Sequence, residues 1–265
     1  TEKFHPGLDG RPVRRELGLG PEHVLLTQIG VRSWRGWTDV LEAMGRIAPR
    51  NERARLLFVG APPPRVAEIG DRARERGLGA RVLVLPHRDD VPRILAASDV
   101  VVDASFKGLG ITGSIREALA CERPVVSTDA EGMPELVVHG ETGLLVPRRA
   151  PDALAEAIVR LVDNPAWAGA MARAGRKRVE AHFSLRAKVE ATEALYQRLR
   201  EGGRAAGGPF PSIAGSSATS GPTSRSSSWG ACSRWWWRPW RGPSPGWSSR
   251  PWTTSSSGAT SPRCG

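Results

Sequence analysis

Residues 105–146 decide the fold of this chain, and they read SFKGLGITGSIREALACERPVVSTDAEGMPELVVHGETGLLV. A glycine-rich turn over residues 108–113 leads into a short helix, which we expect to carry Glu117 in its first turn. Apolar runs of strand length follow at 124–127 and 143–146. The stretch therefore predicts strands that alternate with short helices, with a glycine loop at the start of a helix.

The glycine turn predicts a phosphate site. Unpaired amides at a helix start and the positive end of the helix dipole both face an anion. Gly108, Gly110 and Gly113 allow the backbone to approach such a ligand closely. Glu117 nearby cannot hold a phosphate, but it can accept hydrogen bonds from sugar hydroxyls. This combination predicts a nucleotide-sugar, and a simple strand-to-helix turn is the alternative.

Strands and helices alternate on both sides of this stretch. The strands are continuously apolar, which predicts a parallel sheet buried between helices and an α/β fold class. A second loop opens a helix at Pro134 and Glu135. The other expected strands are residues 24–29, 55–60, 82–85 and 100–102, and the other expected helices are 38–47, 66–76, 91–97, 151–162, 166–181 and 185–199.

Five short motifs, in this order, resemble the donor-binding domain of retaining GT-B glycosyltransferases of family 4. The resemblance extends more loosely over residues 4–199 and implies a Rossmann-like parallel sheet with helices on both faces, one half of a GT-B fold. The motifs are the glycine loop, Glu117-Ala118-Leu119-Ala120-Cys121, Pro124-Val125-Val126, Gly132-Met133-Pro134-Glu135-Leu136-Val137 and Thr142-Gly143-Leu144-Leu145-Val146.

The predicted organisation has three parts. Residues 1–20 are expected to be a lead-in that links two domains, and residues 21–200 the nucleotide-sugar binding domain with its helical C-terminal segment. Residues 201–265 are expected to be disordered. The resemblance implies an N-terminal acceptor domain that this chain does not contain, so the chain is expected to bind donor but to turn over poorly by itself.

The composition of the tail is unusual. Residues 201–265 hold seven Arg and one Glu, and thus supply +6 of the net charge of +11. They also hold seven of the ten Trp and have no periodicity. We hypothesise that this tail is an out-of-frame translation, with an Arg/Trp membrane-surface segment as the alternative. The remaining +5 is ordinary, so the charge does not predict nucleic-acid binding.

The resemblance implies a catalytic role for two cations after the first strand. Arg32 and Arg35 lie in the loop that begins at Gly30. In the resembled family, an Arg and a Lys of this loop neutralise the donor diphosphate and stabilise the leaving group. Arg35 replaces the Lys and can pair with phosphate bidentately. Two solvated arginines are the alternative.

Glu117 is implied to bind the ribose hydroxyls and is included among the catalytic candidates. Its alternative is structural, because Ser114 and Glu117 form an S-x-x-E capping box. The family has a second Glu eight positions earlier, and Leu109 stands there instead. The donor-binding residues implied by the resemblance are Gly30, Gly108, Leu109, Gly110, Ile111, Thr112, Glu117 and Glu135.

The side chains favour no metal or nucleophile site. Cys121, Cys232 and Cys264 lack metal-ligand spacing, and no Ser/His/Asp pattern occurs. His87 follows the third strand and is expected to be a solvated loop residue. Glu135 and Asp129 flank the expected cleft, where a structural role at a helix start is the alternative for Glu135. We expect no cofactor and no metal ion, and a nucleotide-diphosphate sugar as the donor substrate.

The predicted function is transfer of a sugar, with retention, from a nucleotide-sugar to a glycan, lipid or polysaccharide acceptor of the cell envelope. A non-catalytic nucleotide-sugar binding module or partner subunit is the alternative. A dinucleotide-binding oxidoreductase is disfavoured, because Gly30-Val31-Arg32-Ser33-Trp34 is not G-x-G-x-x-G. No run of about 18 apolar residues occurs. The expected location is the cytoplasm, with peripheral attachment at the inner membrane face as a variant.

Overall fold

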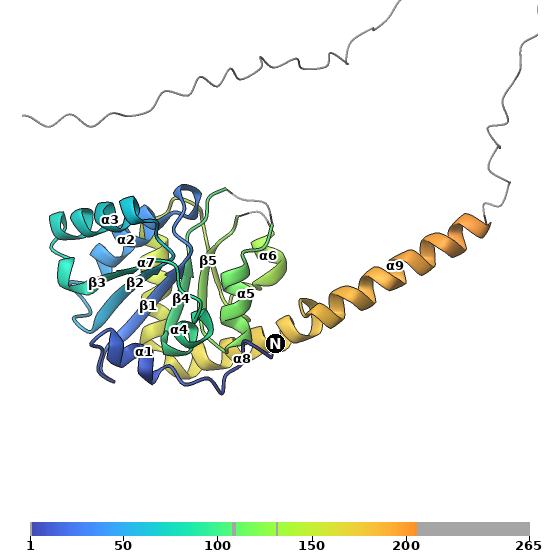
Figure 1. The fold of residues 1–265 in the computed structure, drawn as a ribbon, viewed down its shortest axis with the longest axis horizontal. Helices are drawn as coiled ribbons and strands as arrows, with labels where there is room; N and C mark the ends of the chain where they lie inside the picture. Colours follow the sequence, from blue (N-terminus) through green and yellow to red (C-terminus); the bar gives the residue numbers. More distant parts are fainter. Residues whose placement is uncertain (1, 108–109, 131, 206–265) are drawn as a thin grey trace, which may run out of the picture. The chain divides into compact units, whose positions relative to one another are not determined.

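The computed structural model describes residues 2–107, 110–130 and 132–205 (Figure 1). The predicted donor-site residues Gly108 and Leu109 lie outside these ranges, as do residues 206–265 of the predicted tail. The fold is α/β, as the alternating pattern predicted.

Six parallel strands form one sheet in the order β3-β2-β1-β4-β5-β6. β1 pairs with β2 on one side and with β4 on the other, so Thr27 lies opposite both Leu57 and Val101. The chain therefore builds one half of the sheet, crosses over, and builds the other half. The strands are β1 Val24–Ile29, β2 Ala54–Val59, β3 Val82–Leu85, β4 Val100–Asp103, β5 Val125–Thr128 and β6 Leu144–Val146.

Proline stands in the first two positions of six α-helices among the described residues, where its missing N–H costs no hydrogen bond. The α-helices are α1 Arg11–Glu16, α2 Trp37–Ile47, α3 Pro63–Glu75, α4 Val91–Ala97, α5 Gly113–Ala120, α6 Met133–Leu136, α7 Pro151–Asp163, α8 Pro165–His182 and α9 Leu185–Ala205, and the 3-10 helices are η1 Ser33–Arg35 and η2 Gly79–Arg81.

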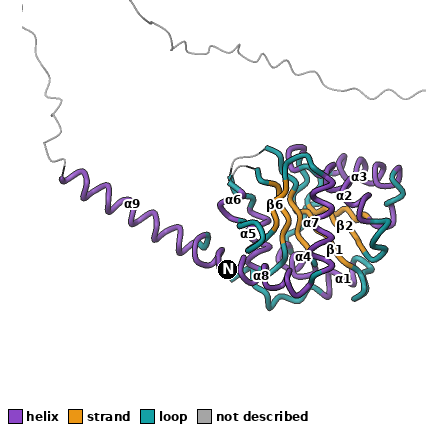
Figure 2. The backbone as a smooth tube through the Cα atoms, turned by 180° about the vertical axis from the view of Figure 1, so that it is seen from behind, coloured by secondary structure: helices purple, strands orange, loops and turns teal. Residues whose placement is uncertain are grey.

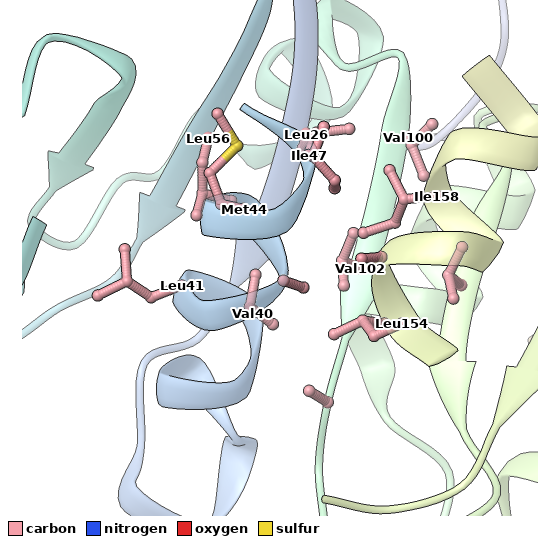
Figure 3. Close-up of a cluster of buried hydrophobic side chains, with 14 of the residues drawn as sticks. Leu26, Val40, Leu41, Met44, Ile47, Leu56, Val100, Val102, Leu154 and Ile158 are labelled. Atoms are coloured by element: carbon pink, nitrogen blue, oxygen red, sulfur yellow. The ribbon is translucent and has the colours of Figure 1, made fainter. Parts of the chain in front are cut away.

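Successive side chains of each strand enter two different cores, because a strand alternates its faces. On one face, Leu26 and Val102 pack with Met44 of α2 and Ile158 of α7 (Figure 3). On the other face, Leu25 and its neighbours pack with α1 and α4, and Val101 and Val125 pack with α5 and α6. Figure 2 shows α7 lying over the first of these faces. Burial of each large apolar side chain contributes about 1.5–3 kcal/mol.

The ends of the domain differ from expectation in two places. A helix, α1, forms within the predicted lead-in, where Val13 is buried and Arg14 donates to the carbonyl of Ala97 at 2.9 Å. α9 continues to Ala205, past the predicted end of its helix. The three domain boundaries stay predictions. No helix in the described ranges has both the length and the apolar character that crossing a membrane requires.

Candidate functional site

A cavity of about 150 Å³ lies where the strand order reverses, beyond the carboxyl ends of β1 and β4. Ligands of open parallel sheets bind at such a switch point. Four of the predicted site residues, Arg35, Gly110, Ile111 and Thr112, line it. The described residues that line it are Trp34, Arg35, Ser105, Lys107, Gly110, Ile111, Thr112, Gly113, Ala130 and Met133.

The local backbone aims Arg35 at the start of α5. Its Nη1 lies 3.3 Å from the hydroxyl of Ser114 and 3.4 Å from the carbonyl oxygen of Ile29. The side chain is 22% exposed, so part of the guanidinium remains open to a ligand. The turn at Gly30 has a φ of +84°, and a β-carbon there would lie 3.5 Å from the guanidinium. The contact would be an ordinary one, so the left-handed backbone, and not a clash with Arg35, is what favours glycine at position 30.

Asp103 organises the floor of this site, although the sequence did not predict a role for it. Its two carboxylate oxygens accept hydrogen bonds from Ser105 Oγ at 2.7 Å and from Thr112 Oγ1 at 2.9 Å. Arg35 Nη1 lies 3.7 Å from Oδ1, and the Asp103 side chain is 1% exposed. The signal that could have identified it is a carboxylate at the end of a buried Val-Val-Val strand, because a buried charge needs partners.

Replacing Asp103 by asparagine should lower the free energy of unfolding by about 2–3 kcal/mol, because an amide nitrogen would face a hydroxyl donor in a buried site. Urea unfolding followed by circular dichroism measures this loss. Asp99→Asn is the control, since Asp99 also accepts two hydrogen bonds, from the Leu25 amide at 2.7 Å and from Arg14 at 3.1 Å, but is 44% exposed. A loss as small as that of the control would show that Asp103 does not organise the floor.

The start of α5 differs from the predicted capping box. Thr112 is the N-cap, Ser114 is the second helical residue, and Glu117 lies in the second turn rather than the first. The hydroxyl of Thr112 bonds to Asp103, and that of Ser114 accepts from Arg35, so neither caps the helix. The capping interpretation of Glu117 is therefore wrong. The first amides of a helix have no intrahelical partner, and Thr112 and Gly113 at the start of α5 line the cavity.

Glu117 lies one helical turn behind Gly113. Its Oε1 is 4.0 Å from the position that a β-carbon on Gly113 would occupy. Glu117 lines a second cavity of about 290 Å³, together with Phe4, Phe183 and Lys188. Gly113 lines the cavity that contains Arg35 and not the one that contains Glu117. The prediction that Arg35 and Glu117 bind a single ligand stays a prediction.

Burial raises the pKa of the Glu117 carboxyl, against the opposing charges of Arg116, Lys3 and Arg35. The folded state therefore disfavours the ionised form, and Glu117 lowers stability as the pH rises through and above its unfolded pKa. Glu117→Gln should be more stable than the wild type at pH 7 and should lose most of this advantage at pH 4. Urea unfolding at both pH values tests this, with the exposed Glu135→Gln as control. An advantage that is equal at the two pH values would contradict it.

The remaining predicted residues are not among the described residues that line the cavity. Arg32 is exposed, before η1, and Glu135 is exposed in the first turn of α6. Asp129 lies 3.6 Å from Arg148, and His87 is 86% exposed. Their proposed roles are not tested by the geometry. No group of three or more metal-binding side chains gathers within the described ranges.

Comparisons with known proteins decide the family. A family model described as glycosyl transferases group 1 matches residues 23–164, more than half of the 265 residues. The chain belongs to this family. The predicted resemblance and the predicted fold class are thereby confirmed, whereas retention of configuration is not tested.

Two curated relatives and one solved structure resemble this chain over about half of their own length. Alpha-maltose-1-phosphate synthase of Mycolicibacterium smegmatis is 34% identical over 208 residues, which are 73% of this chain and 52% of the relative. The lipopolysaccharide core biosynthesis mannosyltransferase LpsB of Rhizobium meliloti is 28% identical over 207 residues, 75% of this chain and 58% of the relative. The crystal structure of Anabaena HepE in complex with UDP and glucose has a TM-score of 0.65 at 25% identity and covers 71% of this chain and 52% of HepE. This group 1 glycosyl transferase chain thus spans about half the length of the curated relatives it matches.

Proposed function

We propose that this chain is the donor-binding half of a retaining glycosyltransferase, which transfers a sugar from a nucleoside-diphosphate sugar to a glycan or lipid acceptor. One observation carries the proposal: the Arg35 guanidinium and the first turn of α5 meet in one cavity at the switch point of the sheet. The guanidinium supplies positive charge, and the helix start supplies amide donors. Both groups suit a diphosphate.

The proposed chemistry is stabilisation of the leaving group. As the glycosidic bond breaks, negative charge grows on the diphosphate, and Arg35 and the α5 amides compensate it in a partly buried site. No metal ion is needed in this scheme. Arg32 would add positive charge near the diphosphate from its exposed position, and Glu117 would accept hydrogen bonds from the ribose. Gly30, Gly108, Leu109 and Glu135 complete the proposed donor site.

Two relatives support the substrate class. HepE was solved with UDP and glucose, and LpsB is a mannosyltransferase by name. The acceptor site is proposed to lie in the half of those proteins that this chain does not match. The proposed location is the cytoplasm, with attachment at the inner membrane face when the acceptor is a lipid.

Calorimetry on the full chain with UDP, GDP, UDP-glucose and GDP-mannose tests the proposal. At least one should bind with a Kd of about 1 mM or tighter, which corresponds to about 4 kcal/mol. If none of the four ligands gives a heat of binding at millimolar concentration, the donor-site assignment is refuted. Efficient glycosyl transfer by this chain alone would refute the half-enzyme part and leave donor binding intact.

A further inference from the structure

Trp34 stands apart from the other exposed hydrophobic side chains. It is 45% exposed, and the other large exposed hydrophobics among the described residues all lie on α9. Exposure of a tryptophan leaves a large apolar ring in water, which costs free energy that a ligand or partner could recover. Its neighbours in the chain do not explain this exposure.

The position of Trp34 is determined by the backbone on both of its sides. It is the central residue of η1, and its carbonyl accepts a hydrogen bond from the Phe106 amide at 3.0 Å. The next carbonyl, that of Arg35, accepts from the buried Gln28 side chain at 2.8 Å. The guanidinium of Arg149 lies 3.3 Å from the Phe106 ring centroid and so restrains the loop after β4 as well. Trp34 is therefore held at a defined place on the cavity wall.

The indole shares its cavity with the groups that suit a diphosphate. Trp34, Arg35, Thr112 and Gly113 line the same space of about 150 Å³. Binding sites for whole small ligands usually measure about 300–1,000 Å³. This cavity is thus large enough for only part of a nucleotide-sugar. The diphosphate of a nucleotide-sugar is bonded to the nucleoside on one side and to the sugar on the other. Glu117, the proposed ribose acceptor, lines the other cavity, so the sugar is the group left for a ring beside Arg35.

We propose that Trp34 is the platform on which the donor sugar rests, with the C–H face of the pyranose stacked on the indole. This inference rests on the proposed function and adds the sugar subsite to it. An aromatic face attracts polarised C–H groups and buries the apolar side of the sugar, while the hydroxyls stay at the rim. Lys107 and Ile111, from the loop after β4, form the neighbouring wall.

The test separates the sugar from the nucleotide. The affinity of the full chain is measured for UDP and UDP-glucose, and for GDP and GDP-mannose, in the wild type, Trp34→Ala and Trp34→Phe. For the pair that the wild type binds, Trp34→Ala should lower the affinity for the nucleotide-sugar about 10-fold, while the affinity for the nucleoside diphosphate changes less than about twofold. Trp34→Phe should retain most of the sugar-dependent affinity.

Tyr196→Ala, which removes an exposed aromatic ring from α9, is the matched control and should change neither affinity. Equal loss for the nucleoside diphosphate and its sugar conjugate would overturn the inference, because Trp34 would then contact the nucleotide. No loss in either would also overturn it, and would leave Trp34 as a surface for a protein partner. Absence of wild-type binding to all four ligands would refute the proposed function together with this inference.

Discussion

Replacing Arg35 by methionine is expected to weaken nucleoside-diphosphate binding about 100-fold. Charge-assisted hydrogen bonds contribute about 1.5–3 kcal/mol each, and about 1.4 kcal/mol corresponds to a tenfold change in Kd. Methionine keeps much of the apolar stem and removes only the guanidinium that lies 3.3 Å from Ser114 at the start of α5. Calorimetry of the full chain with UDP and GDP measures the loss.

Arg32→Met is the matched control for this prediction. Arg32 is exposed and does not line the cavity, so its loss should weaken binding less than about threefold at physiological salt, where exposed charges are screened. Arg35→Lys should recover part of the affinity but not the bidentate geometry. Equal losses of nucleoside-diphosphate affinity for Arg32→Met and Arg35→Met would contradict the proposed site, because the effect would then depend only on net charge. A thermal melt of each variant checks that the domain is still folded.

Replacing Gly36 by alanine is expected to reduce the free energy of unfolding by at least about 3 kcal/mol. Gly36 has a φ of +60°, and a β-carbon there would lie 2.0 Å from the carbonyl oxygen of Ala104. The backbone oxygen cannot rotate away, so β1 and β4 would have to separate at the mouth of the site. Urea unfolding measures the cost, and donor binding should fall with it.

Gly77→Ala separates the clash from the backbone conformation. Gly77 has a φ of +68°, and nothing lies within 4 Å of its added β-carbon. Its substitution therefore carries only the cost of a left-handed conformation, about 1 kcal/mol. An equal loss in the free energy of unfolding for Gly36→Ala and Gly77→Ala would contradict this explanation. Glycine at position 36 would then be required for its backbone conformation and not for close packing.

Most elements of the fold were predictable because their signals are local. The strands Val24–Ile29 and Val82–Leu85 and the helix Val91–Ala97 have the predicted bounds. A continuously apolar run of strand length has few other stable arrangements once helical runs flank it. α1 was missed because only Val13 of its six residues is buried, which leaves too short a pattern to detect.

The site was predictable only in part. Gly110, Gly113, Thr112 and Arg35 were identified from the motif, and all four line one cavity. Asp103 was missed, and the cap was assigned to Ser114 instead of Thr112. Asp103 and Ser114 share a distant partner, Arg35, which is 79 residues from Ser114 in the chain. Hydroxyls that could cap a helix were instead engaged by a carboxylate and a guanidinium.

The amino-acid order alone determined the α/β class, the family motifs and the placement of glycine and proline, because these follow from the backbone preferences and burial of neighbouring residues. The tertiary structure alone decided that β1 lies beside β4, and hence that Arg35, Asp103 and Trp34 belong to one region. The physical reason is that the order of strands in a sheet results from packing between segments far apart in the chain, and the direction of each side chain at the site follows from that order.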